Sequence, residues 1–399
     1  MPTANPLRPA RLAAASFFLL NGIAMGNWVA RIPDVQRRLD LSEGELGFAL
    51  LGSALGALVA LPVSGWLTAR FGSDRMIFLS GAGICLMLPL LPVAPSLALF
   101  FLTLLCFGLV FGMLEVPANA QAVLVESAYR RPLMSSFHAM FSVGGLAGAA
   151  LAGLIAGRGV PPFPHLLAVA AGLLAMTLAA RPLLLPDAPA AQEHGPIFAL
   201  PRGPLLGLGA IGFCVLLGEG AMADWSAVYL SDALGANAAV AAAGYAVFSL
   251  TMAVGRLTGD GITALFGAAR VVRAGGALAA AGLAIGLLLH SVPAALAGFA
   301  CVGAGLAAIF PIAMGATGRV PGVVPSVALT AVATAGYTGF LSGPPVIGFI
   351  AEHFGLRAGL GLVALLSAVI VLLAGAVAGT SVAAVDAAAA SPRAAVPEG

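Results

Sequence analysis

The sequence AMGNWVA at residues 24–30 returns as AMADWSA at residues 221–227, a separation of 197 positions. This separation is close to half of the 399-residue chain, and both copies lie within long apolar segments. Self-similarity at a fixed long period indicates repeated structural units. The heptapeptide therefore predicts a chain of two related halves, both embedded in a membrane.

Further pairs support the duplication at an almost constant separation of 195 positions. LTARFG at residues 67–72 aligns with ITALFG at residues 262–267, and Arg75 then aligns with Arg270. The glycines at 144, 148 and 153 align with those at 339, 343 and 348. Small residues also recur by chance in a chain rich in Ala and Gly, but the shared Trp and Phe-Gly favour duplication. Parallel internal repeats are typical of membrane transporters.

The composition places the chain in lipid and excludes several classes of function. Hydrophobic residues make up 60% of the chain and charged residues 9%, whereas a soluble domain carries roughly 25% charged residues. No GxxxxGK[ST] loop, metal-ligand spacing, catalytic Ser/His/Asp order or nucleic-acid footprint occurs. We therefore expect no enzyme, no cofactor, no metal and no nucleic-acid partner. The four cysteines lie singly in apolar segments, where Cys behaves as a small hydrophobe.

A membrane helix needs about 20 mostly apolar residues, and twelve segments meet this requirement. We expect an all-α membrane protein with a six-helix bundle in residues 1–185, a linker at 186–202, a second six-helix bundle in 203–381 and a disordered tail at 382–399. The segments are 12–31, 45–69, 76–92, 97–125, 133–157, 163–185, 203–231, 238–264, 270–290, 292–318, 324–351 and 355–379.

The distribution of arginines predicts the orientation. With the N-terminus in the cytoplasm, thirteen of the 18 arginines fall on cytoplasmic ends and five on the opposite side, as the positive-inside rule requires. Both termini are then cytoplasmic. Acidic residues surround the outer cluster, so we expect a folded, charge-paired cap there. The five outer arginines are Arg31, Arg37, Arg38, Arg158 and Arg357.

Twelve helices in two six-helix halves resemble the major facilitator superfamily. Its signature between helices two and three is matched by GWLTARFG at residues 65–72, except that Ala69 replaces an aspartate. That acid normally helps to latch the cytoplasmic side shut, and Arg70 and Arg75 remain as gating candidates. The resemblance implies alternating access, and proteins of this superfamily are usually monomers.

The second half carries two further gating candidates, Arg256 and Asp260. They are four positions apart and therefore share one face of a helix, where they could pair at its cytoplasmic end. The alternative is an exposed pair, which is worth about 0–1 kcal/mol.

Glu115 and Asn119 are the leading candidates for the chemistry. A charge within a membrane helix is costly, so an acid there is a functional candidate by default. The two residues are one helical turn apart, and together they could bind a polyol or hold a proton. A structural hydrogen-bond pair between helices is the alternative.

This stretch also resembles the fucose:proton symporter branch of the superfamily. That branch places a glutamate four residues before an asparagine in helix four, as Glu115 and Asn119 are placed, and often a histidine early in helix five, as His138 is placed. The resemblance implies proton coupling, with His138 as a proton relay or as a structural group. The sugar symporters carry an acid in helix one where this chain has Asn27.

Segment 203–231 contains two more acids, Glu219 and Asp224. Five positions correspond to about 140° around a helix, so the two face different ways. Asp224 occupies the repeat position of Asn27, and Arg31 lies one turn beyond Asn27. An Arg31–Asp224 pair could latch the outer side or could be a static interface bond.

These residues predict a bacterial inner-membrane transporter that moves a small polar solute, such as a sugar or polyol, by proton symport. Glu115 would accept the coupling proton, with Glu219, Asp224 and His138 as further candidates. Efflux of amphipathic compounds by proton antiport is the alternative, and a non-transporting membrane sensor is a third reading. The expected partners are the substrate, protons and the lipid bilayer. The predicted substrate-binding residues are Asn21, Asn27, Glu115, Asn119, Glu219, Tyr245 and Tyr337.

Overall fold

The structure is a computed structural model that describes residues 7–130, 133–186 and 198–378. Over these ranges it is helical, with no strand. Eleven helical stretches of the described chain are long and apolar enough to cross a membrane. The 30-residue helix α13 (Pro325–Phe354) packs against α3 and α8 as the twelfth. The predicted all-α membrane fold is confirmed.

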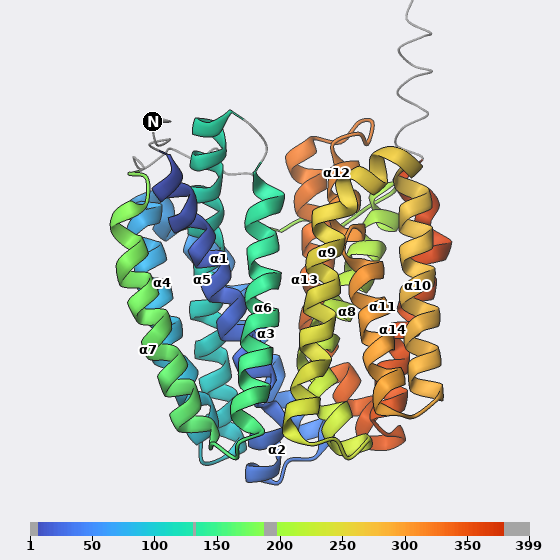
Figure 1. Ribbon diagram of the computed structural model, residues 1–399. Helices are drawn as coiled ribbons and strands as arrows, with labels where there is room; N and C mark the ends of the chain where they lie inside the picture. The colour runs from blue at the N-terminus through green and yellow to red at the C-terminus, as the bar shows by residue number, and fades with distance from the viewer. Residues whose placement is uncertain (1–6, 131–132, 187–197, 379–399) are drawn as a thin grey trace, which may run out of the picture.

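The first half lies on one side of the molecule and the second half on the other (Figure 1). The first half contains α1 (Arg8–Val29), α2 (Ile32–Leu39), α3 (Glu43–Phe71), α4 (Ser73–Met87), η1 (Leu88–Val93), α5 (Leu97–Tyr129), α6 (Met134–Ala156), α7 (Pro162–Ala180) and η2 (Arg181–Leu183). The second half contains α8 (Leu205–Val228), the π-helical turn η3 (Tyr229–Ala233), α9 (Ala238–Phe266), α10 (Ala268–Leu288), α11 (Val292–Leu306), α12 (Ile309–Thr317), α13, α14 (Leu356–Leu373) and η4 (Ala374–Val377).

Every predicted segment is helical within a few residues of its predicted ends. The tenth segment differs, because it is broken between α11 and α12. Helix α2 is the expected charge-paired cap: Asp34 lies 2.9 Å from Arg31 and 2.7 Å from Arg37. The predicted tail lies outside the described residues, as does most of the predicted linker, so the domain boundaries stay predictions.

The repeat reappears as the same backbone turn in both halves. Gly72 joins α3 to α4 with φ 85° and ψ 152°, and Gly267 joins α9 to α10 with φ 83° and ψ 148°. This backbone region is essentially restricted to glycine. The shared glycine of LTARFG and ITALFG therefore has a geometric cause.

Two seams of small residues join the halves, α3 against α13 and α6 against α9. A Cβ added to Gly348 would lie 2.9 Å from the Cα of Gly47, and one added to Gly153 would lie 3.1 Å from the Cβ of Ala242. Both partners of the first contact are related to those of the second by the 195-residue offset. Small residues let helix backbones approach closely, so the duplicated glycines build two equivalent seams.

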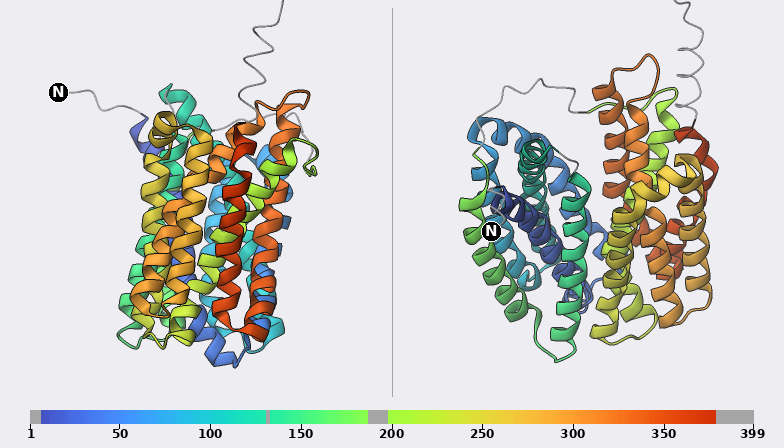
Figure 2. Two further views of the ribbon diagram at one scale, coloured as in Figure 1. Left: turned by 90° about the vertical axis from the view of Figure 1, so that its right-hand side faces the viewer. Right: turned by 45° about the horizontal axis from the view of Figure 1, so that its top comes forward.

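The halves meet at the end of the molecule where α2 lies, which we call the α2 side. They diverge toward the opposite end, the α12 side, where α1 also begins (Figure 1). The tilted view in Figure 2 shows the same separation on the α12 side. A hydrogen bond joins α3 to α13 on the side where the halves meet. The backbone amide of Gly44 donates to Glu352 at 2.9 Å, near the α2-side ends of both helices.

We expect Gly267→Ala to destabilise the protein by about 1–3 kcal/mol, because alanine is strained at this positive φ. The surroundings add no clash, since no other atom lies within 4 Å of the new Cβ. Gly261→Ala is the control, because its Cβ also meets open space but its backbone is helical, where alanine is favoured over glycine. Thermal unfolding midpoints in detergent compare the two, and equal midpoints would contradict the assignment.

Candidate functional site

Four predicted site residues lie in one layer of the bundle. Counted from the helix ends on the α12 side, Glu115 is 14 residues into α5, Glu219 is 14 residues into α8, Tyr337 is 12 into α13 and Asn21 is 13 into α1. A helix rises about 1.5 Å per residue, so these side chains lie about 18–21 Å from that end. This is the depth at which transporters of repeated architecture bind their substrates.

Glu115 and Tyr337 connect the two halves within this layer. The Tyr337 phenol from α13 donates a hydrogen bond to the Glu115 carboxylate from α5. Glu115 is an exposed residue although it is far from either end of its helix. Because its partner belongs to the opposite half, the carboxylate faces the space between the halves and not the lipid.

Asn119 does not contact the Glu115 carboxylate through its amide N–H. Its Nδ2 donates instead to the backbone carbonyl of Glu115 at 2.9 Å. The sequence therefore predicted the shared face correctly, but in this conformation Asn119 bonds to its own helix and not to the carboxylate. Its Oδ1 stays available as an acceptor.

Arg256 has two partners on other helices that its sequence position did not reveal. Its Nη2 lies 3.0 Å from the Glu219 carboxylate of α8, and its Nη1 donates to Ser142 of α6 at 3.3 Å. These two partners were not predicted, and the role of Arg256 and Asp260 as a cytoplasmic latch stays a prediction. Spacing along α9 showed only the neighbour on the same helix, whereas the guanidinium reaches across to two other helices. Since α6 belongs to the first half, this cluster also bridges the halves.

The predicted pair of Arg31 and Asp224 is wrong in this conformation. Arg31 is 3% exposed and bonds to Asp34, to the Val160 carbonyl and to His165, all in the first half. Asp224 is 8% exposed, and within the described chain it has no hydrogen-bond or ion-pair partner. Asp34, three residues along the chain, forms the ion pair with Arg31 that the sequence analysis predicted for Asp224 of the other half.

Two predicted substrate-binding residues lie in packed regions. Asn27 is fully buried, donates to the Ile23 carbonyl at 2.9 Å and lies 2.9 Å from His165 Nε2. Tyr245 is 4% exposed in the α6–α9 seam, where it bonds to Ser249 and packs against Gly145. Neither is available to a solute in this conformation.

The remaining candidates are two residues inside the bundle, Asn21 and His138, and two arginines near the α3–α4 turn, Arg70 and Arg75. Asn21 keeps a buried Oδ1 without a hydrogen-bond partner in the described chain. The His138 ring packs edge-on against Phe18, with centroids 5.2 Å apart. Arg70 lies over the Phe71 ring, 5.6 Å from its centroid, and Arg75 is exposed at the start of α4. Their roles as relay and gate stay predictions.

A pocket of about 320 Å³ begins where the α3–α13 seam ends, toward the α12 side. Tyr337 lines it, together with a row of hydroxyls one turn apart on α13. Apolar side chains of α3 form the facing wall. The hydroxyls belong to Thr330, Thr334 and Thr338, and the apolar wall to Leu58, Leu61 and Pro62.

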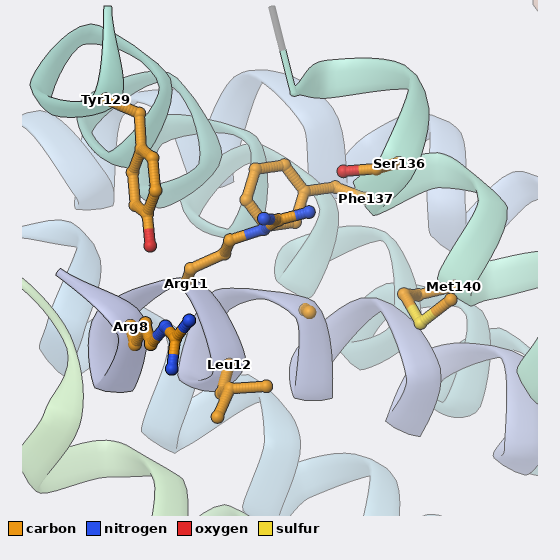
Figure 3. Close-up of a pocket in the computed structure, with 8 residues that line it drawn as sticks. Arg8, Arg11, Leu12, Tyr129, Ser136, Phe137 and Met140 are labelled. Atoms are coloured by element: carbon orange, nitrogen blue, oxygen red, sulfur yellow. The ribbon is translucent and has the colours of Figure 1, made fainter. Parts of the chain in front are cut away.

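Figure 3 shows a second pocket, of about 580 Å³, within the first half alone. Arg8, Arg11 and the Tyr129 hydroxyl gather around it, and Leu12 and Met140 form apolar parts of its wall. None of its described lining residues is acidic. The pocket concentrates positive charge on the α12 side, but a site within one half is not opened and closed by the movement of two halves.

His165 is the functional candidate that the sequence analysis missed. It is the fourth residue of α7, 2% exposed, and it joins Asn27 to Arg31. A lone histidine in an apolar segment gives no periodic signal. Only the Arg31/Asp34 spacing of three residues pointed toward this network.

The family model and the curated relatives that match this chain agree with each other. The Major Facilitator Superfamily model matches residues 12–218. An uncharacterised MFS-type transporter of Yersinia pestis is 38% identical over 88% of this chain and 91% of its own length. The membrane protein MosC of Rhizobium meliloti is 34% identical over 88% of this chain and 86% of its own.

Solved structures share the fold at much lower identity. A mutant of the nucleoside transporter NupG has a TM-score of 0.69 and 15% identity, covering 93% of this chain and 100% of that chain. A bacterial homologue of the human lysosomal transporter Spinster, inward-facing and occupied, has a TM-score of 0.69 and 16% identity, covering 94% and 98%. With the family model and the relatives, these findings show that the chain belongs to the major facilitator superfamily of membrane transporters.

Proposed function

We propose that this protein moves a small polar solute across the bacterial inner membrane by proton-coupled symport. The observation that carries the proposal is the Glu115 carboxylate, which faces the space between the halves at mid-depth and binds Tyr337 of the opposite half. An ionisable group at this depth is costly and is retained at ion and substrate pathways. A proton on Glu115 removes the charge that opposes closure of an apolar cavity.

The described conformation corresponds to the cytoplasm-facing step of the cycle, if the arginine distribution gives the orientation. The α12 side is then cytoplasmic, and the α2 side faces out and is closed. After Glu115 releases its proton to the cytoplasm, the Tyr337 hydroxyl stabilises the carboxylate by donating a hydrogen bond to it, and this bond joins the two empty halves. An outward-facing protein takes up the next proton and solute, and protonated Glu115 lets the loaded halves move.

The polar groups of the pocket that Tyr337 lines suit a solute that carries hydroxyls. The Thr330 and Thr338 hydroxyls donate to their own helix at 2.9 and 2.8 Å, so their lone pairs remain free to accept. The Oδ1 of Asn21 has no hydrogen-bond partner in the described chain but is buried in this conformation, so it could accept from a solute only after a rearrangement. Sugars and polyols supply the matching O–H donors, as the resemblance to the fucose:proton symporter branch also suggests. NupG is a nucleoside transporter by its title, which makes nucleosides a second class to test.

One observation favours the alternative, a proton-coupled efflux antiporter of amphipathic compounds. The α3 wall of the pocket is apolar, and Phe198 adds an aromatic ring to it. The two functions differ in the direction of the gradient that drives accumulation. Symport accumulates solute on the less acidic side of the membrane, whereas antiport accumulates it on the more acidic side.

We expect Glu115→Gln to reduce proton-driven accumulation at least about tenfold, because glutamine cannot accept the coupling proton. A thermal-shift screen of sugars, polyols, nucleosides, organic acids and drugs on the purified protein first identifies the ligand. Uptake of that ligand into proteoliposomes under an imposed pH gradient then measures the effect.

The matched control is Asp40→Asn, which also removes one carboxylate. Asp40 is exposed and ends α2 with a φ of 51°, a conformation that asparagine adopts readily. Asp40→Asn should accumulate the ligand like the wild type. Unchanged proton-driven uptake by Glu115→Gln would refute the proposal.

Tyr337→Phe should lower the uptake rate by about tenfold, because a hydrogen bond to a charged group contributes about 1.5–3 kcal/mol. Tyr245→Phe makes the same chemical change in the buried α6–α9 seam and should affect thermal stability more than uptake. Initial uptake rates and unfolding midpoints separate the two. A Tyr337→Phe protein with wild-type uptake would show that the cross-half bond is incidental.

A further inference from the structure

A chain of polar contacts runs from a buried histidine to the contact between the halves. His165 Nε2 lies 2.9 Å from Asn27 Oδ1, and Arg31 Nε donates to His165 Nδ1 at 3.1 Å. Arg31 Nη1 then binds Asp34 at 2.9 Å, and Asp34 also binds Arg37 at 2.7 Å. All of these residues belong to the first half, on the α2 side.

Arg37 carries the chain across to the second half. Its Nη1 donates to Ser231 at 2.8 Å and lies 4.0 Å from the Asp232 carboxylate, both in η3. Arg37 is therefore shared between Asp34 of its own half and the opposite half. We call Asp34, Arg37, Ser231 and Asp232 the α2-side latch.

The hydrogen bonds define the protonation state of His165. Arginine is always protonated in proteins, so its Nε–H is a donor and His165 Nδ1 must be the acceptor. Asn27 Nδ2 is occupied by the Ile23 carbonyl at 2.9 Å, which leaves Oδ1 facing the ring. Nε2 must therefore carry the hydrogen, and the ring is neutral with both nitrogens used.

A proton on Nδ1 is incompatible with this arrangement. It would place an N–H donor against the Arg31 Nε–H donor and a second positive charge beside the guanidinium. Arg31 and Asp34 are the charged groups that face the ring. The packed elements α4 and η1 add none, since between residues 81 and 93 only Cys85 can ionise. Nothing in the described surroundings therefore compensates for the extra charge except Asp34, which already binds two arginines.

We propose that His165 is a proton-binding site of the α2-side gate, occupied only when that gate is open. A protonated His165 displaces Arg31, Asp34 loses the geometry in which it holds Arg37, and the contact with η3 is released. Acid on the α2 side therefore favours the conformation open to that side, and the proton must leave the ring before the gate closes again. This inference rests on the proposed proton-driven transport for its use in the cycle, but its test needs neither substrate nor transport.

The test measures gate opening directly. Val93 and Leu289 are exposed on the α2 side, one in each half, and are changed to Cys in a protein whose four native cysteines are replaced. Spin labels on the pair report the distance between the halves at about pH 5.5 and about pH 8, on either side of the ordinary histidine pKa. We expect the ratio of open to closed populations to rise on acidification, by up to about tenfold per pH unit for one linked proton.

His165→Gln should abolish this response and remain closed, because a neutral amide can accept from Arg31 and donate to Asn27. His353→Gln is the matched control, since His353 lies on the same side but is exposed and bonds only its own helix at the Phe349 carbonyl. It should keep the full response. Asp34→Asn should populate the open form at both pH values, because it weakens the latch and leaves both hydrogen-bond partners of the ring, Arg31 and Asn27, in place.

A wild type without a pH response, or a His165→Gln protein that keeps it, would overturn the proposal. If His165→Gln does not fold, NMR of the labelled imidazole nitrogens in the wild type replaces it. The closed form should show the neutral Nε2–H tautomer, and a doubly protonated ring in the closed form would overturn the proposal. Proton-driven uptake without gate opening by acid would refute this inference and leave the proposed function intact.

Discussion

The carboxylate of Glu115 lies at mid-depth between two apolar bundles, where an ion is costly and must be compensated. The Tyr337 hydroxyl of the opposite half supplies part of that compensation. The arrangement around it follows from the duplication of the chain. Because each half repeats the same glycines, the halves meet along two equivalent seams, and these seams bring α5 and α13 close enough for the bond. The proposed proton site is thus also a contact between the two halves.

The polar contacts between the halves differ along the axis of the molecule. On the α2 side, Arg37 and Glu352 join the halves. In the middle layer, Glu115 and Arg256 do so. Toward the α12 side the α3–α13 seam gives way to a pocket. Groups that can gain or lose a proton therefore lie at two levels between the halves. A change in the charge of either group would change the strength of the contact at its level.

The sequence predicted the helices and the repeat well because both depend on local properties. Apolar length identifies a span, and the glycines of LTARFG and ITALFG recur because the same turn requires them in each half. Glu115 became a candidate for the same reason, since a charge in an apolar segment stands out without any knowledge of neighbours.

Partners between helices could not be predicted in this way. Arg256 shares a helix face with Asp260, but its guanidinium reaches Glu219 and Ser142, which no spacing along α9 reveals. Arg31 was matched with Asp224 by pseudo-symmetry, whereas Asp34 lies nearer along the chain. His165 was not identified because one histidine in an apolar helix has no pattern, and its hydrogen-bond partners lie on α1 and at the start of α2.

The most direct test of the central claim is the sidedness of access to the mid-depth layer. Thr338 lines the pocket beside Tyr337, and Thr338→Cys in a cysteine-free protein can be labelled by a membrane-impermeant maleimide from either face of sealed vesicles. The account predicts labelling from the α12 side without ligand, and a shift to the α2 side when that side is acidic and supplied with ligand. Labelling from the α12 side alone under all conditions, or from both sides at once, would contradict alternating access around Glu115.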